Sequence, residues 1–126
     1  MSMLSQKDQS PFRALVRFTQ GDITAYLNNA LNRRGYTDVQ IDYKYDENGS
    51  QLDRFAIPTL NATVAASKDG KPETETISSG DILETVFAEL VSDGHTVDKA
   101  SLSFGYSAMD RQVYGEVVLL VPRKRS

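Results

Sequence analysis

Hydrophobic residues recur along this chain with two periods, one typical of helices and one typical of strands. Between Thr19 and Gly35, apolar residues occur at i, i+3, i+4, i+7 and i+8, which makes one face of an amphipathic helix. Thr19 stands three residues before Asp22, as in an N-terminal cap, and Gly35 can adopt the left-handed conformation that ends a helix. The pattern therefore predicts a helix over residues 20–34.

A second helix is predicted over residues 79–93 from matching signals. Its apolar positions are again spaced by three and four residues, Ser78 and Asp81 occupy the capping positions, and Gly94 follows the last turn. It begins 59 residues after the first helix, so that residues 21–23 (Gly-Asp-Ile) recur at 80–82. The spacing indicates an internal repeat, although capped helices share such signals whether or not they share ancestry.

The intervening segments alternate apolar and polar residues, as half-buried strands do. Residues 117–121 are apolar on both faces, which predicts that the last strand lies centrally in a sheet. Pro58 cannot donate to a strand ladder, so its strand is expected to be an edge strand or to bend there. Asn48-Gly49 and Asp69-Gly70 are expected to form turns. The predicted strands cover residues 12–18, 38–46, 54–67, 72–78, 97–107 and 112–121.

These elements define an α+β fold made of two βαββ-type units. The units, at about residues 11–67 and 71–122, would each leave a helix face and a sheet face exposed, so they must share one core within a single domain. We expect a mainly antiparallel sheet, or a pair of sheets, with both helices packed on one side. A ferredoxin-like βαββαβ core with an extra hairpin is the alternative. Residues 1–10 are expected to be a flexible N-terminus and residues 123–126 a basic tail.

Composition removes several kinds of chemistry. The 126 residues include no Cys, no Trp and one His, so there is no disulfide, no thiolate nucleophile and no Cys-ligated metal centre. The longest aliphatic run, residues 117–121, is far shorter than the roughly 20 residues of a spanning helix, and the N-terminus does not read as a secretory signal. We expect a cytoplasmic protein with no membrane contact, no cofactor and no metal.

Candidate catalytic residues are few, and each has a simpler structural explanation. His95, the single imidazole, follows the glycine that ends the second helix, where a cation complements the helix dipole. Asp22 and Asp81 occupy matching positions, but their capping roles explain both. No Walker A, G-x-G-x-x-G or G-x-S-x-G pattern occurs. The sequence therefore predicts a protein that is not an enzyme.

Aromatic residues suggest a binding surface only weakly. Tyr43 and Tyr45 share one strand face, and paired aromatics on a sheet can stack on nucleic-acid bases. The basic-aromatic motif of RNA-recognition domains is absent, and both tyrosines share their face with Val39 and Ile41. Core packing is therefore the favoured interpretation of this pair, whereas Tyr36, Tyr106 and Tyr114 are left open.

Charge is unevenly distributed along the chain. The net charge of −3 combines +3 over residues 1–37, −9 over residues 38–110 and +3 over residues 111–126. If the first and last strands are neighbours, seven cationic residues could form one basic patch. These residues are Arg13, Arg17, Arg33, Arg34, Arg123, Lys124 and Arg125. The competing interpretation is a solvated tail and a helix end whose cations complement the dipole.

Two functional hypotheses follow. The first is a non-catalytic binding protein, a small accessory or regulatory factor that acts through protein–protein interaction and self-association. Its size and acidity resemble those of compact proteins that phages and mobile elements encode, an analogy that no motif supports. The second is a nucleic-acid-binding protein that uses the basic patch, with an affinity that falls steeply with salt. Homo-oligomerisation is expected because sheet edges need cover.

Overall fold

The computed structural model describes residues 12–52 and 55–121 of the chain, which form two helices and six strands. The predicted flexible N-terminus (1–10) and basic tail (123–126) lie outside these ranges. In chain order the elements are β1 (Phe12–Thr19), α2 (Gln20–Arg33), β2 (Tyr36–Leu52), β3 (Phe55–Lys68), β4 (Lys71–Ile77), α3 (Ser79–Ser92), β5 (Thr96–Ser107) and β6 (Gln112–Val121).

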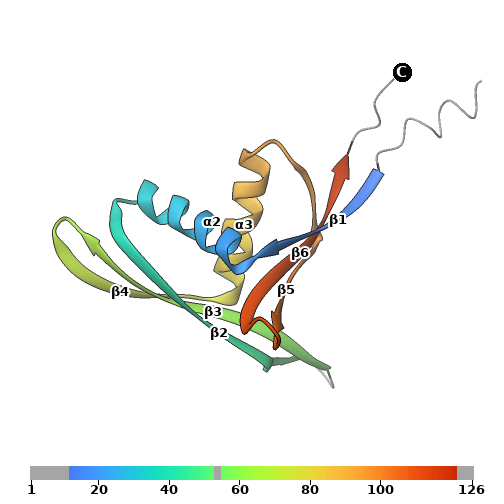
Figure 1. The fold of residues 1–126 in the computed structure, drawn as a ribbon, viewed down its shortest axis with the longest axis horizontal. Helices are drawn as coiled ribbons and strands as arrows, with labels where there is room; N and C mark the ends of the chain where they lie inside the picture. Colours follow the sequence, from blue (N-terminus) through green and yellow to red (C-terminus); the bar gives the residue numbers. More distant parts are fainter. Residues whose placement is uncertain (1–11, 53–54, 122–126) are drawn as a thin grey trace, which may run out of the picture.

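The strands form two three-stranded antiparallel sheets, with orders β1-β6-β5 and β2-β3-β4. The sheets meet at an angle, and both helices lie inside that angle (Figure 1). The α+β class is thus confirmed, in the form of a pair of sheets. The ferredoxin-like alternative is not what forms, because the described strands divide between two sheets. β6 lies centrally, as its two-sided apolar run predicts, and pairs with β1.

Each sheet combines strands from both halves of the chain. β1 from the first half completes the sheet of β5 and β6, while β4 from the second half completes the sheet of β2 and β3. The two strand orders coincide when β1, β2 and β3 are matched with β4, β5 and β6. The elements that match in this way are about 59 residues apart, the offset found in the sequence. Gly35 and Gly94, for example, follow the two helices 59 residues apart and have similar φ angles of 94° and 93°. The division into two units stays a prediction.

The helix caps form as the sequence predicts. The Thr19 side chain accepts a hydrogen bond from the backbone N–H of Asp22, whose carboxylate accepts one in return from the Thr19 N–H. Ser78 accepts the equivalent bond from the N–H of Asp81. Apolar side chains of both helices and both sheets then share one core, which includes Ile23, Leu27, Leu60, Val64, Ile82, Val86 and Val117.

Two glycines in the first sheet make room for aromatic rings on the neighbouring strand. Gly115 of β6 is paired with Phe18 of β1, and a Cβ atom at Gly115 would overlap the Cε2 and Cζ atoms of that ring. Gly105 of β5 is paired with Tyr114 of β6, whose Cζ would lie 2.5 Å from an added Cβ. A ring that covers a cross-strand glycine shields exposed backbone and fixes strand register.

The β2–β3 hairpin differs from the prediction. Asn48-Gly49 does not end the strand, because β2 continues to Leu52 through a register break opposite Pro58. The pairing jumps from Asp46 with Thr59 to Ser50 with Ile57, so the break falls where proline has no N–H to give. β3 as a whole is the central strand of its sheet, so the first of the two expectations for Pro58, an edge strand, was wrong, whereas the ladder is irregular at the point where the second expected a bend. Its pairing with β4 begins only at Ala62, beyond Pro58.

Candidate interaction surfaces

The two arginines of β1 are held by carboxylates on the neighbouring strands. Arg13 reaches across β6 to Asp98 of β5 at 2.9 Å, and Arg17 pairs with Glu116 of β6 at 3.1 Å. The Arg17 guanidinium also lies over the Tyr114 ring, 4.1 Å from its centroid. Both arginine side chains stay more than half exposed. Their positive charge is nevertheless balanced by a nearby anion, which weakens the field they offer to a phosphate.

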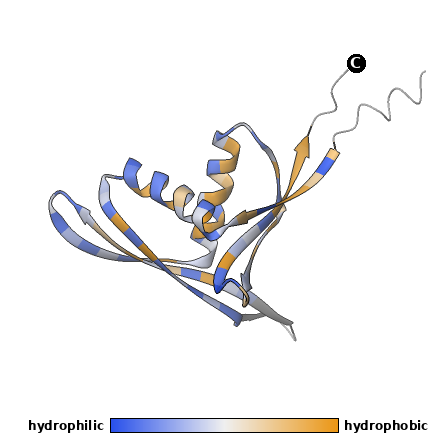
Figure 2. Cartoon of the chain, in the orientation of Figure 1, coloured by the Kyte–Doolittle hydropathy of each residue, from blue (hydrophilic) through white to orange (hydrophobic). Residues whose placement is uncertain are grey.

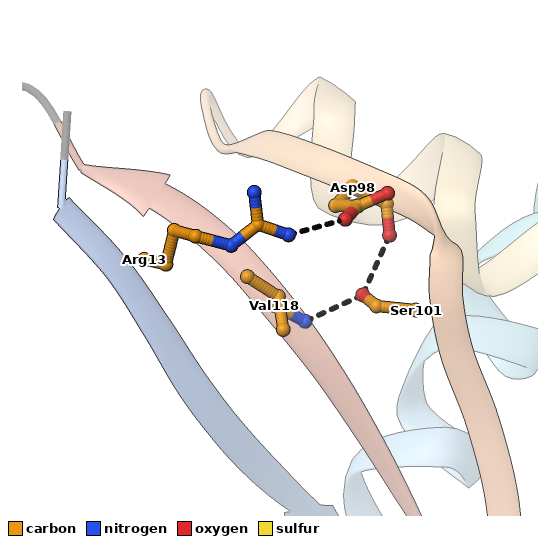
Figure 3. A network of polar contacts seen from close by, with 4 residues as sticks. All are labelled: Arg13, Asp98, Ser101 and Val118. Carbon is orange, nitrogen blue, oxygen red and sulfur yellow. Dashed lines mark hydrogen bonds and ion pairs between the residues drawn. The ribbon is translucent and has the colours of Figure 1, made fainter. Parts of the chain in front are cut away.

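A small polar network supports the Arg13 contact where β5 leaves its regular register (Figure 3). The pairing of β5 with β6 is interrupted between Asp98 and Ser103. There the Val118 N–H donates to the Ser101 hydroxyl at 2.7 Å, and this hydroxyl donates to the Asp98 carbonyl at 2.6 Å. The serine side chain takes the place of the missing ladder acceptor, so the interrupted edge of β5 is satisfied internally.

The two arginines at the end of α2 are also paired. Arg33 forms an ion pair with Glu89 of α3. Arg34 forms a second ion pair with Glu75 of β4, in which the Arg34 Nη2 and Glu75 Oε1 atoms are 3.5 Å apart. The Glu89 side chain is only 6% exposed. Arg33 thereby links the two helices and neutralises a buried carboxylate.

The structure therefore separates the candidate basic residues. β1 and β6 are neighbours, as the hypothesis requires, but the end of α2 lies on the opposite side of the molecule from the start of β1 (Figure 1). The four arginines of the candidate patch that lie within the described residues form two groups, and each has a carboxylate partner. Arg123, Lys124 and Arg125 lie outside the described residues.

A groove of about 560 Å³ opens between the two sheets, beside the start of α2. Tyr43 and Tyr45 of β2 line one side, and Tyr106 of β5 lines the other. The rings of Tyr45 and Tyr106 stack across it, with centroids 6.1 Å apart and planes 20° from parallel. The Tyr43 hydroxyl is hydrogen-bonded to the Thr24 hydroxyl at 2.8 Å. The first two tyrosines are thus half-buried against the core, as expected, and also face the groove.

The chemistry of this groove selects no ligand. Burial raises the pKa of the Tyr43 phenol, and the bond to Thr24 lowers it by less, so the group stays neutral at ordinary pH. The charged residues along the lining, Asp42, Lys44 and Arg111, carry both signs. The groove thus combines aromatic rings with charges of both signs, and these features do not define one class of ligand.

The outer edge of β1 exposes several apolar side chains. β1 pairs with β6 alone among the described strands, in an unbroken register of eight residue pairs from Phe12–Val121 to Thr19–Tyr114. Leu15 is 68% exposed, Val16 38% and Val121 44%. Figure 2 shows that apolar residues follow β1 and β6 to the end of the sheet that projects past the helices. The outer side of β1 has no partner strand among the described residues, and aliphatic side chains lie beside it.

The strand in the equivalent place of the other sheet is built in the opposite way. β4 reads Lys-Pro-Glu-Thr-Glu-Thr-Ile where β1 reads Phe-Arg-Ala-Leu-Val-Arg-Phe, 59 residues earlier. Lys71, Pro72 and Glu73 are exposed and carry the features that keep sheet edges from pairing. The remaining edges, β2 and β5, are interrupted by register breaks. β1 is thus the unprotected edge of the described fold.

Sequence reasoning overlooked this edge, although it had the signal. Comparison of the two strands at the repeat offset shows charged residues and proline on one and aliphatic residues on the other. What the sequence could not show was that both strands lie at edges, because that depends on the strand order.

The other residues singled out in the sequence have structural roles. His95 is exposed, and its backbone N–H donates to the Leu90 carbonyl at 3.1 Å in the C-terminal cap of α3. Asp22 and Asp81 sit at the caps described above. The described residues contain no group of three or more His, Asp or Glu side chains placed to hold a metal ion. No helix among them has the length and apolarity to cross a membrane.

Comparison of the chain with protein-family models, with curated proteins and with solved structures gives no match. The surfaces described above are therefore the basis for any functional conclusion.

Proposed function

We propose that this chain is a binding protein without catalytic activity, a small accessory or regulatory factor that acts by accepting an additional strand at the β1 edge. The observation that carries the proposal is the contrast between the two equivalent edges. β4 is protected by Lys71, Pro72 and Glu73, whereas β1 exposes Leu15 and Val16 beside a regular ladder. An edge strand that lacks the protective features of its counterpart can pair with a further strand.

Strand addition is the mode of recognition that fits such an edge. Backbone hydrogen bonds supply affinity, and side chains on alternate faces supply specificity. Leu15 lies on the face that carries Arg13 and Arg17, while Val16 lies on the face that continues into the core through Phe18. An added strand would therefore cover aliphatic surface on both faces of the sheet. The class of partner is an extended protein segment, which includes a segment of the chain's own copies.

The nucleic-acid alternative receives less support. Each described arginine of the candidate patch has a carboxylate partner, and the two groups belong to different elements, β1 and the end of α2. A strip of free cations that follows a phosphate backbone is the feature that such binding needs.

The test replaces one edge residue and its counterpart at the repeat offset. Leu15→Lys places a charge on the open edge, and Thr74→Lys does the same on β4. Both residues are exposed, so both variants should keep the fold, which circular dichroism and thermal unfolding will check. Association is measured by sedimentation of the purified protein over a range of concentrations, and by recovery of bound proteins from the native host.

Leu15→Lys should weaken association by about 5- to 30-fold, because burial of one exposed leucine contributes roughly 1–2 kcal/mol. Thr74→Lys should leave association unchanged. If the two variants behave alike, or if the unaltered protein associates with nothing in either assay, strand addition at β1 is not its function.

A further inference from the structure

We infer that the strand that adds to β1 comes from a protein segment in which an aliphatic residue is flanked by acidic residues, two positions away on each side. This inference rests on the proposed use of the β1 edge and names the chemistry of its partner. It starts from the order of side chains on one face of β1, where Leu15 lies between Arg13 and Arg17. β1 carries no acidic residue.

The charge that lies next to an added strand is that of β1. Side chains directly opposite each other on neighbouring strands have Cβ atoms about 4.5–5.5 Å apart. Strands lie about 4.7–4.9 Å apart, so Glu116 on β6 is one strand further from the added strand, and Asp98 on β5 is two strands further. An acidic residue opposite Arg17 is therefore attracted by the arginine more strongly than Glu116 repels it, and a basic residue is repelled.

Both arginines keep donors for a further carboxylate. The hydrogen bonds to Asp98 and Glu116 each use the Nη2 nitrogen, and a guanidinium group has several other N–H donors. The Arg13 and Arg17 side chains are 66% and 62% exposed. Arg13 reaches across β6 toward β5 (Figure 3), whereas the partner of Arg17 lies on the adjacent strand. The acidic residue opposite Arg17 should therefore contribute more than the one opposite Arg13.

The aliphatic position of the partner follows from the row of side chains between the two ion pairs. Leu15 is paired with Val118 of β6 on this face and is 68% exposed. An aliphatic residue opposite Leu15 would extend this row by one strand and remove the leucine from water.

This recognition differs from binding to a nucleic-acid backbone. Phosphates are attracted by the field of a strip of cations, which Asp98 and Glu116 weaken here. The backbone hydrogen bonds of an added strand instead hold its side chains opposite those of β1, where the nearest charge decides. The net charge of −3 acts over longer distances and is screened within about 8–10 Å at ordinary salt concentrations. An acidic segment is thus compatible with an acidic protein.

The test uses a short peptide with blocked ends, Thr-Glu-Thr-Leu-Thr-Glu-Thr, which reads the same in both strand directions. Two matched peptides carry Gln or Lys in place of both Glu residues. Each peptide is titrated into the isotope-labelled protein, and the amide chemical shifts give both the binding site and the Kd. The titrations are repeated with Arg17→Gln and with Arg34→Gln, a control that removes the same charge at the end of α2.

The shifts should concentrate on β1, and the Glu peptide should bind about 1.5- to 5-fold more tightly than the Gln peptide, with the Lys peptide weakest. Arg17→Gln should remove the preference for Glu over Gln, whereas Arg34→Gln should retain it. Equal affinities of the three peptides at β1, a preference for Lys, or an unchanged preference in Arg17→Gln would overturn the inference and leave the proposed function standing. If no peptide shifts the β1 amides, the inference fails as well, and the comparison of Leu15→Lys with Thr74→Lys then decides separately whether the edge is used.

Discussion

Replacement of Gly115 by alanine should disturb a place where a strand backbone lies directly under a buried ring. A Cβ atom at this position would overlap the Cε2 and Cζ atoms of Phe18 and lie 3.0 Å from its Cδ2. Carbon atoms in contact are normally about 3.5–4.0 Å apart. The Phe18 ring would have to swing away, yet it is 5% exposed and meets the rings of Tyr26 and Phe104 edge-on, at centroid distances of 6.3 and 6.5 Å.

The expected cost can be worked from two opposing contributions. Overpacking of a well-filled core typically costs about 1–3 kcal/mol. Replacing glycine by alanine returns roughly 0.4–1 kcal/mol by reducing the freedom of the unfolded chain. Because the added Cβ would overlap two ring atoms, the upper part of the overpacking range, about 2–3 kcal/mol, applies, and we expect Gly115→Ala to lower the free energy of unfolding by about 1–2.6 kcal/mol. Gly80→Ala is the matched control, because an added Cβ there meets nothing within 4 Å, and it should be neutral or stabilising.

The assay is urea unfolding followed by circular dichroism, with the slope m checked to be unchanged. A double-mutant cycle with Phe18→Leu isolates the contact, since a smaller side chain leaves room for the added methyl group. The cost of the double variant should then be smaller than the sum of the two single-variant costs by about 1 kcal/mol or more. If Gly115→Ala is as stable as the unaltered protein, or if the two costs simply add, the ring does not fill the space above Gly115 and the reasoning is refuted.

Two further predictions concern the core. Arg33→Ala leaves the buried carboxylate of Glu89 without its ion-pair partner and should lower the free energy of unfolding in urea by about 1–3 kcal/mol. Arg34→Ala, at a wider and more exposed ion pair, should lower it by less than about 1 kcal/mol. Equal losses for the two variants would contradict the role of Arg33 in linking the helices. Because burial raises the pKa of Tyr43 in the folded state, its contribution to stability is present below pH 10 and is lost as pH rises through the folded pKa. Tyr43→Phe should therefore reduce the loss of stability above pH 10 in thermal unfolding, and an unchanged alkaline loss would show that other groups cause it.

Most of the helices and strands could be predicted from local sequence patterns. Both helices, their caps and the glycines that end them follow from residues within a few positions of each other, so sequence reasoning finds them. The two-sided apolar run at the end of the chain correctly placed β6 in the centre of a sheet, since only a strand covered on both faces tolerates it.

Long-range relations were out of reach. Arg13 and Asp98 are 85 residues apart in sequence, and only the order β1-β6-β5 brings them together. The expected basic patch treated arginines as free, although their partners are carboxylates from distant segments. The prediction that the β2–β3 hairpin turns at Asn48-Gly49 was wrong for a similar reason. The register of β2 against β3 past Pro58 decided where the hairpin ends, and the local turn signal did not.

The exchange of outer strands between the two halves of the chain has a consequence for how the molecule holds together. β1 belongs to the sheet of the second half and β4 to that of the first, while Asp69-Gly70 is a two-residue turn between β3 and β4. Cleavage at that turn would leave both sheets complete, and each fragment would still contribute one strand to the sheet of the other. Neither half could unfold without removing a strand from the sheet of the other half, so we expect the chain to unfold in a single cooperative transition.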